Sequence, residues 1–164
     1  MAQIRAEPLA MKIAHWHSQQ IHPDEQLDYR NLLGACLGGQ GNPSELQHCD
    51  SRQGSRDCSR NPSNPADRFE TLLRYDGKGR VLSNDAAFDQ ELNDVLGLNS
   101  PILVQNRLDV LKGFLRALGD KKFGASQWEN WEREWSGHGT AGDLRPYCQV
   151  VVYWLQKRLK RMVS

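Results

Sequence analysis

The chain has 164 residues and a formal net charge of +1, because 21 lysine and arginine residues nearly balance 20 aspartate and glutamate residues. This length fits one domain with a modest core. No apolar run approaches the roughly 20 residues of a membrane helix, and the start lacks the apolar stretch of a signal peptide. We therefore expect a cytoplasmic protein without a membrane partner.

The first half of the chain predicts short elements in chain order. Residues 11–17 and 31–36 are expected to form two strands, joined by a polar loop that carries the turn signal His22-Pro23-Asp24. Residues 49–57 predict one or two helical turns, and a loop rich in proline and asparagine follows at residues 61–65. The order of strand, strand and short helix predicts an α+β fold.

The second half predicts a hairpin and then helices. Residues 69–75 and 80–83 are expected to pair around a glycine-containing turn. Apolar spacing predicts helices at residues 88–96, 101–118, 126–135 and near 147–162. Ser100 is expected to cap the second of these helices and Ser126 to open a capping box for the third. The residues expected to face inward are Val104, Leu108, Leu111, Leu115 and Leu118, then Trp128, Trp131 and Trp135, then Val151, Val152, Leu155, Leu159 and Met162.

Three polar residues in the first half suggest phosphodiester hydrolysis, which needs an activated water and a cation that stabilises developing negative charge. His15 can serve as general base, Asn31 can orient it or hold the strand turn, and Asp50 offers oxygen ligands to magnesium or manganese. Arg52 and Arg56 can clamp a phosphate. Each residue also has a purely structural interpretation: a satisfied histidine, a turn asparagine, a helix N-cap and a solvated basic face.

The four cysteines are more typical of metal ligands or buried thiols than of disulfides in a cytoplasmic chain. Cys36 and Cys49 flank a glycine-rich loop that could bring both thiolates onto one structural zinc ion, with Cys58 and His48 as further candidates. Cys148 lies in an apolar helical stretch and is expected to pack in the core.

These stretches resemble the HNH endonucleases associated with retron and Septu defence systems, which are PtuB-like proteins. The resemblance rests on residues 12–16, residues 27–33 with Cys36, and residues 47–54, and it continues through Asn61-Pro62, residues 92–99, Asn106-Arg107 and residues 146–148. It implies a ββα-metal (HNH) nuclease core in residues 1–66. A hairpin and a mainly helical extension in residues 67–164 would pack on that core as one domain.

The resemblance also implies roles and partners. By position, His15 matches the general base, Asn31 the middle asparagine and Asp50 the third site, while Cys36 and Cys49 match the second half of a structural zinc site. Such proteins act on nucleic acid beside a PtuA-type ATPase in bacterial anti-phage defence. In the retron version, a reverse transcriptase and its reverse-transcribed DNA hold the nuclease in check.

Two features depart from the family pattern. Ala14 stands where the family has an acidic residue just before the histidine, and no cysteine precedes Cys36, whereas relatives carry a CxxC pair ahead of the first strand. The leading hypothesis is a metal-dependent endonuclease that acts on DNA or RNA. A catalytically weakened subunit that binds the partner ATPase is the alternative, and a small zinc-dependent regulatory domain is a third interpretation.

Overall fold

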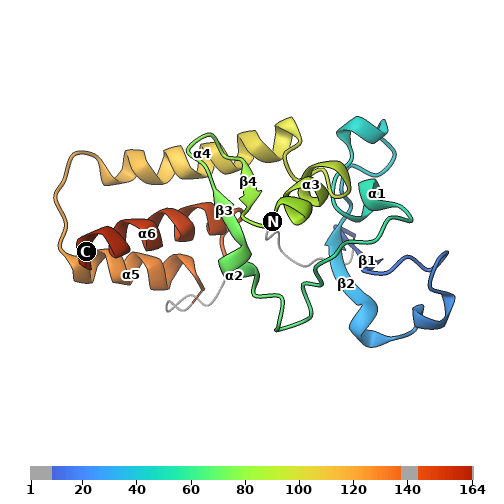
Figure 1. Ribbon diagram of the computed structural model, residues 1–164. Coiled ribbons are helices and arrows are strands. Elements are labelled where there is room, and N and C mark those ends of the chain that lie inside the picture. Colours follow the sequence, from blue (N-terminus) through green and yellow to red (C-terminus); the bar gives the residue numbers. More distant parts are fainter. Residues whose placement is uncertain (1–8, 138–143, 164) are drawn as a thin grey trace. The chain divides into compact units, whose positions relative to one another are not determined.

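The computed structural model describes residues 9–137 and 144–163, and it is a mixed α+β structure with two small antiparallel sheets (Figure 1). Contacts divide the described residues into two compact units. The loop-rich unit comprises residues 9–74 and 81–101, and the helical unit comprises residues 75–80, 102–137 and 144–163. The segment 81–101 therefore groups with the residues predicted as the nuclease core rather than with the helical extension.

The loop-rich unit begins with a two-stranded antiparallel sheet. Strand β1, Met11–His15, pairs with β2, Leu32–Cys36, in a register that places Met11 opposite Cys36 and His15 opposite Leu32. The strands are connected through the single 3-10 turns η1, Pro23–Glu25, and η2, Tyr29–Asn31. A third such turn, η3, Ser44–Leu46, precedes helix α1, Asp50–Gln53. The predicted order of strand, strand and helix is confirmed, but β1 ends two residues early and α1 has only four residues.

The rest of the loop-rich unit contains α2, Phe69–Leu72, the first two residues of the short strand β3, Leu73–Tyr75, the short strand β4, Val81–Ser83, and helix α3, Ala86–Asp94. The predicted strand over residues 69–75 is wrong in its first four residues. There the amides of Thr71 and Leu72 both donate to the carbonyl of Arg68, so the chain closes a helical turn before it extends. The buried apolar residues of this part are Val81, Phe88, Leu92 and Leu98.

The helical unit is built from α4, Pro101–Leu118, α5, Ala125–Trp135, and α6, Cys148–Val163, of which α5 and α6 pack as a pair (Figure 1). Their shared core consists of Leu111, Phe114, Leu118, Trp128, Trp135, Cys148, Val150, Val151, Val152 and Leu155. The predictions that Trp128, Trp135 and Cys148 belong to the core are thereby confirmed, and Trp131 is partly buried against it. No helix among residues 9–137 and 144–163 combines the length and apolar character needed to cross a membrane.

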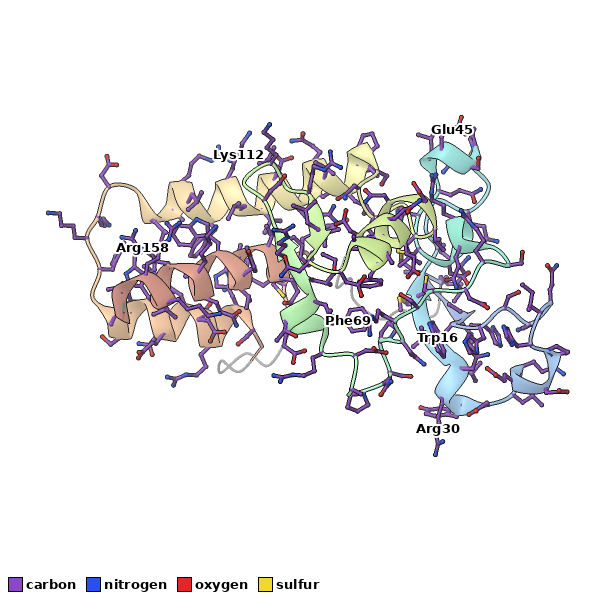
Figure 2. The ribbon with its side chains drawn as sticks, in the orientation of Figure 1. Trp16, Arg30, Glu45, Phe69, Lys112 and Arg158 are labelled. Carbon is purple, nitrogen blue, oxygen red and sulfur yellow. The ribbon has the colours of Figure 1, made fainter. Side chains whose placement is uncertain are left out.

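The buried face of α4 differs from the predicted stripe. Its buried residues are Leu103, Arg107, Leu111, Phe114 and Leu118, whereas Leu115 is 37% exposed. Phe114 turns inward because its ring meets the rings of three tryptophans, Trp131, Trp135 and Trp154, edge to face. Arg107 tolerates burial because its Nε donates to the Gly79 carbonyl at 2.7 Å. On α6, Met162 is exposed, contrary to prediction. Arg158 of the same helix (labelled in Figure 2) has its guanidinium carbon 5.5 Å from the centre of the Trp128 ring.

Two predicted caps are also wrong. Ser100 Oγ is buried without a hydrogen-bond partner, so it does not cap α4. Helix α5 begins at Ala125 with Gly124 as its N-cap, which places Ser126 inside the helix rather than ahead of it. By contrast, Asp85 caps α3 through hydrogen bonds from the amides of Ala87 and Phe88.

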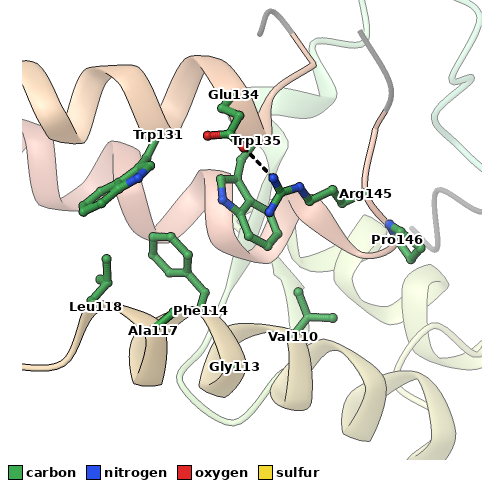
Figure 3. A pocket seen from close by; sticks show the side chains of 10 residues that line it. All are labelled: Val110, Gly113, Phe114, Ala117, Leu118, Trp131, Glu134, Trp135, Arg145 and Pro146. Carbon is green, nitrogen blue, oxygen red and sulfur yellow. Dashed lines mark hydrogen bonds and ion pairs between the residues drawn. The ribbon is translucent and has the colours of Figure 1, made fainter. Parts of the chain in front are cut away.

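A cavity of about 680 Å³ lies between α4, α5 and the residues just before α6 (Figure 3). It is lined mostly by apolar side chains, including Phe114, Trp131 and Trp135. Its two charged lining residues, Glu134 and Arg145, form an ion pair with each other, and the Arg145 guanidinium lies 4.7 Å from the centre of the Trp135 ring. The two charged groups that line the cavity therefore balance each other.

Candidate functional site

The loop between β2 and α1 brings two cysteines and a histidine together. Cys36 is the last residue of β2, and the chain then turns back so that the His48 amide donates to the Gly38 carbonyl at 2.8 Å. Gly38 has a φ of +59°, and a Cβ atom there would lie 2.1 Å from the His48 carbonyl oxygen. Glycine is therefore required for this close approach. Cys49 follows with a φ of +55° and serves as the N-cap of α1.

The three side chains form a half-buried cluster. The Sγ atoms of Cys36 and Cys49 are 3.9 Å apart, and His48 Nδ1 lies 3.4 Å from Cys49 Sγ and 4.0 Å from Cys36 Sγ. None of the four cysteines forms a disulfide. Two thiolates on one tetrahedral zinc ion, each at about 2.3 Å, would be about 3.8 Å apart. The observed separation matches that value and is far longer than the roughly 2.05 Å of a disulfide.

The electrostatics of the cluster favour one thiolate. Hydrogen bonds from the Cys49 thiol and the His48 ring lower the pKa of Cys36 from 9.0 to about 4. The hydrogen bond to Cys36, together with burial, raises the pKa of Cys49. One proton is thus shared by a closely spaced pair of sulfurs, and a cation that replaced it would meet two ligands already in position.

Asp50, the predicted cation ligand, has a different partner. Its Oδ2 forms an ion pair with Lys12 Nζ at 2.7 Å, and Lys12 also donates to Ser51 Oγ at 2.7 Å. Both side chains of the ion pair are about three-quarters buried. The ammonium group of Lys12 therefore already neutralises the Asp50 carboxylate to which a divalent cation would bind.

His15 lies at the end of β1, three residues after Lys12. Alternation along the strand puts these two side chains on opposite faces, and three residues of strand span about 10 Å. The His15 ring contacts the Gln26 carbonyl oxygen through Nε2 at 3.1 Å, and the Gln19 amide nitrogen lies within 2.9 Å of both ring nitrogens. The structure thus places His15 against the β1–β2 connection, and Asp50 beside Lys12.

Asn31 holds the β1–β2 connection. It is 3% exposed, its Oδ1 accepts from the His17 amide at 2.7 Å, and its Nδ2 donates to the carbonyls of His17 and Glu25 at 3.1 and 3.2 Å. Of the two roles predicted for Asn31, holding the strand turn is the one that these hydrogen bonds describe.

The predicted phosphate-binding arginines donate to the backbone. Arg52 Nη1 donates to the Ser44 carbonyl at 2.9 Å. Arg56 donates through Nη1 to the Asp94 carbonyl at 2.8 Å, through Nε to Gln53 at 3.1 Å, and through Nη2 to the carbonyl of Arg52. Arg52 therefore connects α1 to η3, and Arg56 connects α1 to the last residue of α3.

A second cluster, which the sequence interpretation missed, comprises His17, His22 and Asp57. One ligand atom from each of these residues lies within 4.8 Å of the other two. It and the Cys36–His48–Cys49 cluster are the two groups of at least three potential metal ligands found within residues 9–137 and 144–163. Three histidines within residues 15–22 were the available signal. Asp57 could not be connected to them because 35 residues separate it from His22.

Comparisons with known proteins add no assignment. No family model matches this chain, and no curated protein matches it.

Proposed function

We propose that the loop-rich unit is a metal-stapled ββα module of the HNH type and that the protein is a metal-dependent endonuclease. The observation that carries this proposal is the order β1, β2 and α1, with Cys36 at the end of the hairpin and Cys49 at the start of the helix. Antiparallel strands followed by a short helix can present a histidine, a carboxylate and a bound cation to one phosphodiester.

Within this proposal, Cys36, His48 and Cys49 hold a structural zinc ion. Sulfur and imidazole nitrogen are the ligands that zinc prefers, and the separation of the two Sγ atoms suits a tetrahedral site. Zinc bound here would tie the end of β2 to the start of α1. A water molecule would complete the coordination of the ion.

The catalytic roles are those that the resemblance assigns, and they require His15 and Asp50, which lie toward opposite faces of β1, to be brought to one phosphate by a local rearrangement. His15 would accept the proton of the attacking water, and Asp50 would hold magnesium or manganese once Lys12 is displaced from it. When bound, that ion would stabilise negative charge on the phosphate. Asn31 would act by positioning, because it fixes the connection that carries the residues contacting His15.

The resemblance to PtuB-like proteins supports the biological setting of the proposal. In that setting, the chain is the effector subunit of an anti-phage complex with a PtuA-type ATPase. A retron reverse transcriptase and its reverse-transcribed DNA would be further partners, and DNA or RNA would be the substrate.

Nicking assays with DNA and RNA substrates, in magnesium or manganese and with the partner ATPase present, test this function. Cleavage should disappear in His15→Ala and weaken in Asp50→Ala, while the neighbouring exposed Gln20→Ala should cut at the unsubstituted rate. The enzyme proposal fails if neither nucleic acid is cut, or if His15→Ala cuts as fast as the unsubstituted chain.

A second candidate function is a binding module without cleavage. Two observations favour it: the Lys12 ammonium is paired with Asp50, and large apolar side chains on the β1–β2 connection face solvent. Leu27 and Tyr29 are both 86% exposed, and a partner protein could cover these two neighbouring side chains. Substitution of Ala14→Glu separates the alternatives, because a gain of cleavage identifies a disabled enzyme and binding without such a gain identifies an adaptor.

A further inference from the structure

The cluster of His17, His22 and Asp57 joins the β1–β2 connection to the segment after α1. His22 Nε2 lies 2.9 Å from Asp57 Oδ2, and the Ser18 amide donates to Asp57 Oδ1 at 3.2 Å. These side chains are between one-quarter and two-fifths exposed, so an ion from solvent can reach them. The carboxylate is thus already oriented toward the two imidazoles.

Glu25 orients the His17 ring in the way that metal-binding histidines usually require. Its Oε2 lies 2.6 Å from His17 Nδ1. A hydrogen bond from Nδ1 to this carboxylate fixes the tautomer in which Nε2 carries the lone pair. Carboxylates that accept the second N–H of a histidine in this manner increase its basicity as a metal ligand.

We propose that His17, His22 and Asp57 bind a divalent transition ion of the zinc class, with Glu25 positioning His17. Two imidazole nitrogens and one carboxylate oxygen suit zinc, cobalt or nickel better than magnesium, which prefers oxygen ligands. Two ligand atoms at about 2.0–2.1 Å from one ion lie about 2.9–3.4 Å apart, depending on the coordination geometry. The observed His22–Asp57 separation falls at the lower end of that range.

Three protein ligands leave a coordination position for a further ligand. His17 and Glu25 also line a cavity of about 560 Å³, together with Trp16, Asp28, Arg30, Asn31, Asn61, Ser63, Asn64 and Pro65 (Trp16 and Arg30 are labelled in Figure 2). A small anion in this cavity could approach Arg30 and the ion bound to His17. The site therefore has the open character of a ligand-binding or catalytic ion rather than that of a closed structural one.

Binding requires one rearrangement. The His17 and His22 rings are stacked, with centroids 4.4 Å apart and planes inclined by 24°. A metal must lie in the plane of each imidazole that binds it, so at least one ring has to rotate about its χ2 angle. This rotation changes the environment of the ring nitrogens and gives a direct spectroscopic readout.

The first test is metal titration of the untagged full chain after removal of bound metal. Cobalt should bind with two stoichiometric steps, one with the strong near-ultraviolet absorption of a cobalt–thiolate site and one without it. His22→Gln and Asp57→Asn should each abolish the second step or weaken it at least about tenfold, and Glu25→Gln should weaken it by about 10–100-fold. The thiolate step should not change in these variants.

Two matched controls lie in the same part of the chain. Asp24→Asn alters a neighbouring carboxylate on η1, and His15→Gln alters a neighbouring histidine, and both should retain the second step. The proposal is overturned if His22→Gln and Asp57→Asn bind cobalt as the unsubstituted chain does. It is equally overturned if only the thiolate step occurs.

A measurement on the unsubstituted chain covers the case in which a variant does not fold. In nitrogen NMR spectra, zinc added beyond the thiolate step should shift the ring nitrogens of His17 and His22 and leave those of His15 in place. Absence of these shifts at saturating zinc contradicts the site. Neither experiment depends on nucleic-acid cleavage, so failure of the nuclease proposal and failure of this site are distinguishable.

Discussion

The ammonium group of Lys12 lies 2.7 Å from Asp50 Oδ2, at the side chain that the sequence marks as a cation ligand. A lysine in this position competes with a divalent ion for the same oxygen. The charge on Asp50 is therefore already compensated before any metal binds.

Replacement of Lys12→Met should strengthen manganese binding at Asp50, because it removes the competing charge and keeps an unbranched side chain. A largely buried ion pair of this kind contributes about 1 kcal/mol, so the dissociation constant of manganese should fall roughly five- to tenfold. Manganese electron paramagnetic resonance measures the free ion directly. Lys78→Met, at an exposed turn position, is the control that should leave binding unchanged. An unaltered constant in Lys12→Met would show that Asp50 does not bind the ion.

Cys36 should be alkylated by iodoacetamide at a rate that is nearly constant between pH 6 and pH 9 in metal-free protein. Its pKa of about 4 keeps it deprotonated over this whole range, whereas an ordinary thiol gains about tenfold in thiolate for each pH unit below its pKa of 9.0. Burial raises the pKa of Cys58 to about 12, so Cys58 should react slowly. Peptide mapping by mass spectrometry separates the two sites. A Cys36 rate that climbs tenfold per pH unit would contradict the shared-proton description.

Gly38→Ala should weaken zinc binding at the thiolate cluster by at least about tenfold, because the added Cβ would displace the His48 carbonyl. Gly41→Ala is the matched control: its φ is also positive, at +87°, but a Cβ there meets nothing within 4 Å. It carries backbone strain without the collision. Competition with a zinc-sensitive dye provides the affinities, and equal losses in the two variants would refute the steric argument.

The stability of the loop-rich unit should fall as the pH drops below about 4. Hydrogen bonds from the Asn61 amide and from Arg60 hold the pKa of Asp67 below its ordinary 3.8, and Arg60 does the same for Asp85. A carboxyl group whose pKa is lower in the folded state stabilises the fold above its unfolded pKa and loses this contribution as the pH falls through the folded value. The destabilisation caused by Arg60→Gln should therefore be larger at pH 7 than at pH 3. Hydrogen exchange of the α3 amides measures this destabilisation. If the destabilisation by Arg60→Gln were the same at pH 7 and pH 3, the ion pairs of Arg60 with Asp67 and Asp85 would not contribute to stability.

Phe114→Ala should destabilise the helical unit by about 3–5 kcal/mol, since it empties the space between three tryptophans. The adjacent Leu115→Ala should cost less than about 1 kcal/mol because Leu115 is partly exposed. Tryptophan fluorescence during urea unfolding reports this unit, which contains four of the five tryptophans. A larger loss of stability in Leu115→Ala than in Phe114→Ala would instead support the inward face of α4 that was predicted from the sequence.

Local sequence signals predicted the elements well and their inward faces less well. The β1–β2 pair, the short α1 and the tryptophan face of α5 follow from turn residues and apolar spacing. Val104, Leu108 and Leu115 fitted helical periodicity about as well as the buried set, and only the tertiary contacts of Phe114 and Arg107 decide between the two faces.

Part of the candidate site could likewise be predicted from local sequence, and part of it depends on tertiary contacts. Cys36 and Cys49 could be paired from the glycine-rich loop between them, because the loop is short and its turn is local. The second cluster depends on Asp57, which the β1–β2 connection meets only in the folded chain. The partners of Lys12, Arg52 and Arg56 were equally unreadable, since nothing in a sequence specifies which carbonyl or carboxylate a long cationic side chain will reach.

Within residues 9–57, Ala14 is the single buried apolar side chain, while Ile13, Leu27 and Tyr29 are largely exposed. Polar residues such as Asn31 and Gln53 occupy the interior of this stretch instead. With so little apolar burial, local opening should cost far less here than in the tryptophan-lined helices. Ions bound by the two clusters would shift the equilibrium between the locally opened and the folded state toward the folded state by mass action. The supply of metal in the cell would then determine the fraction of molecules in which residues 9–57 are folded. That fraction would not depend on how much of the protein is synthesised.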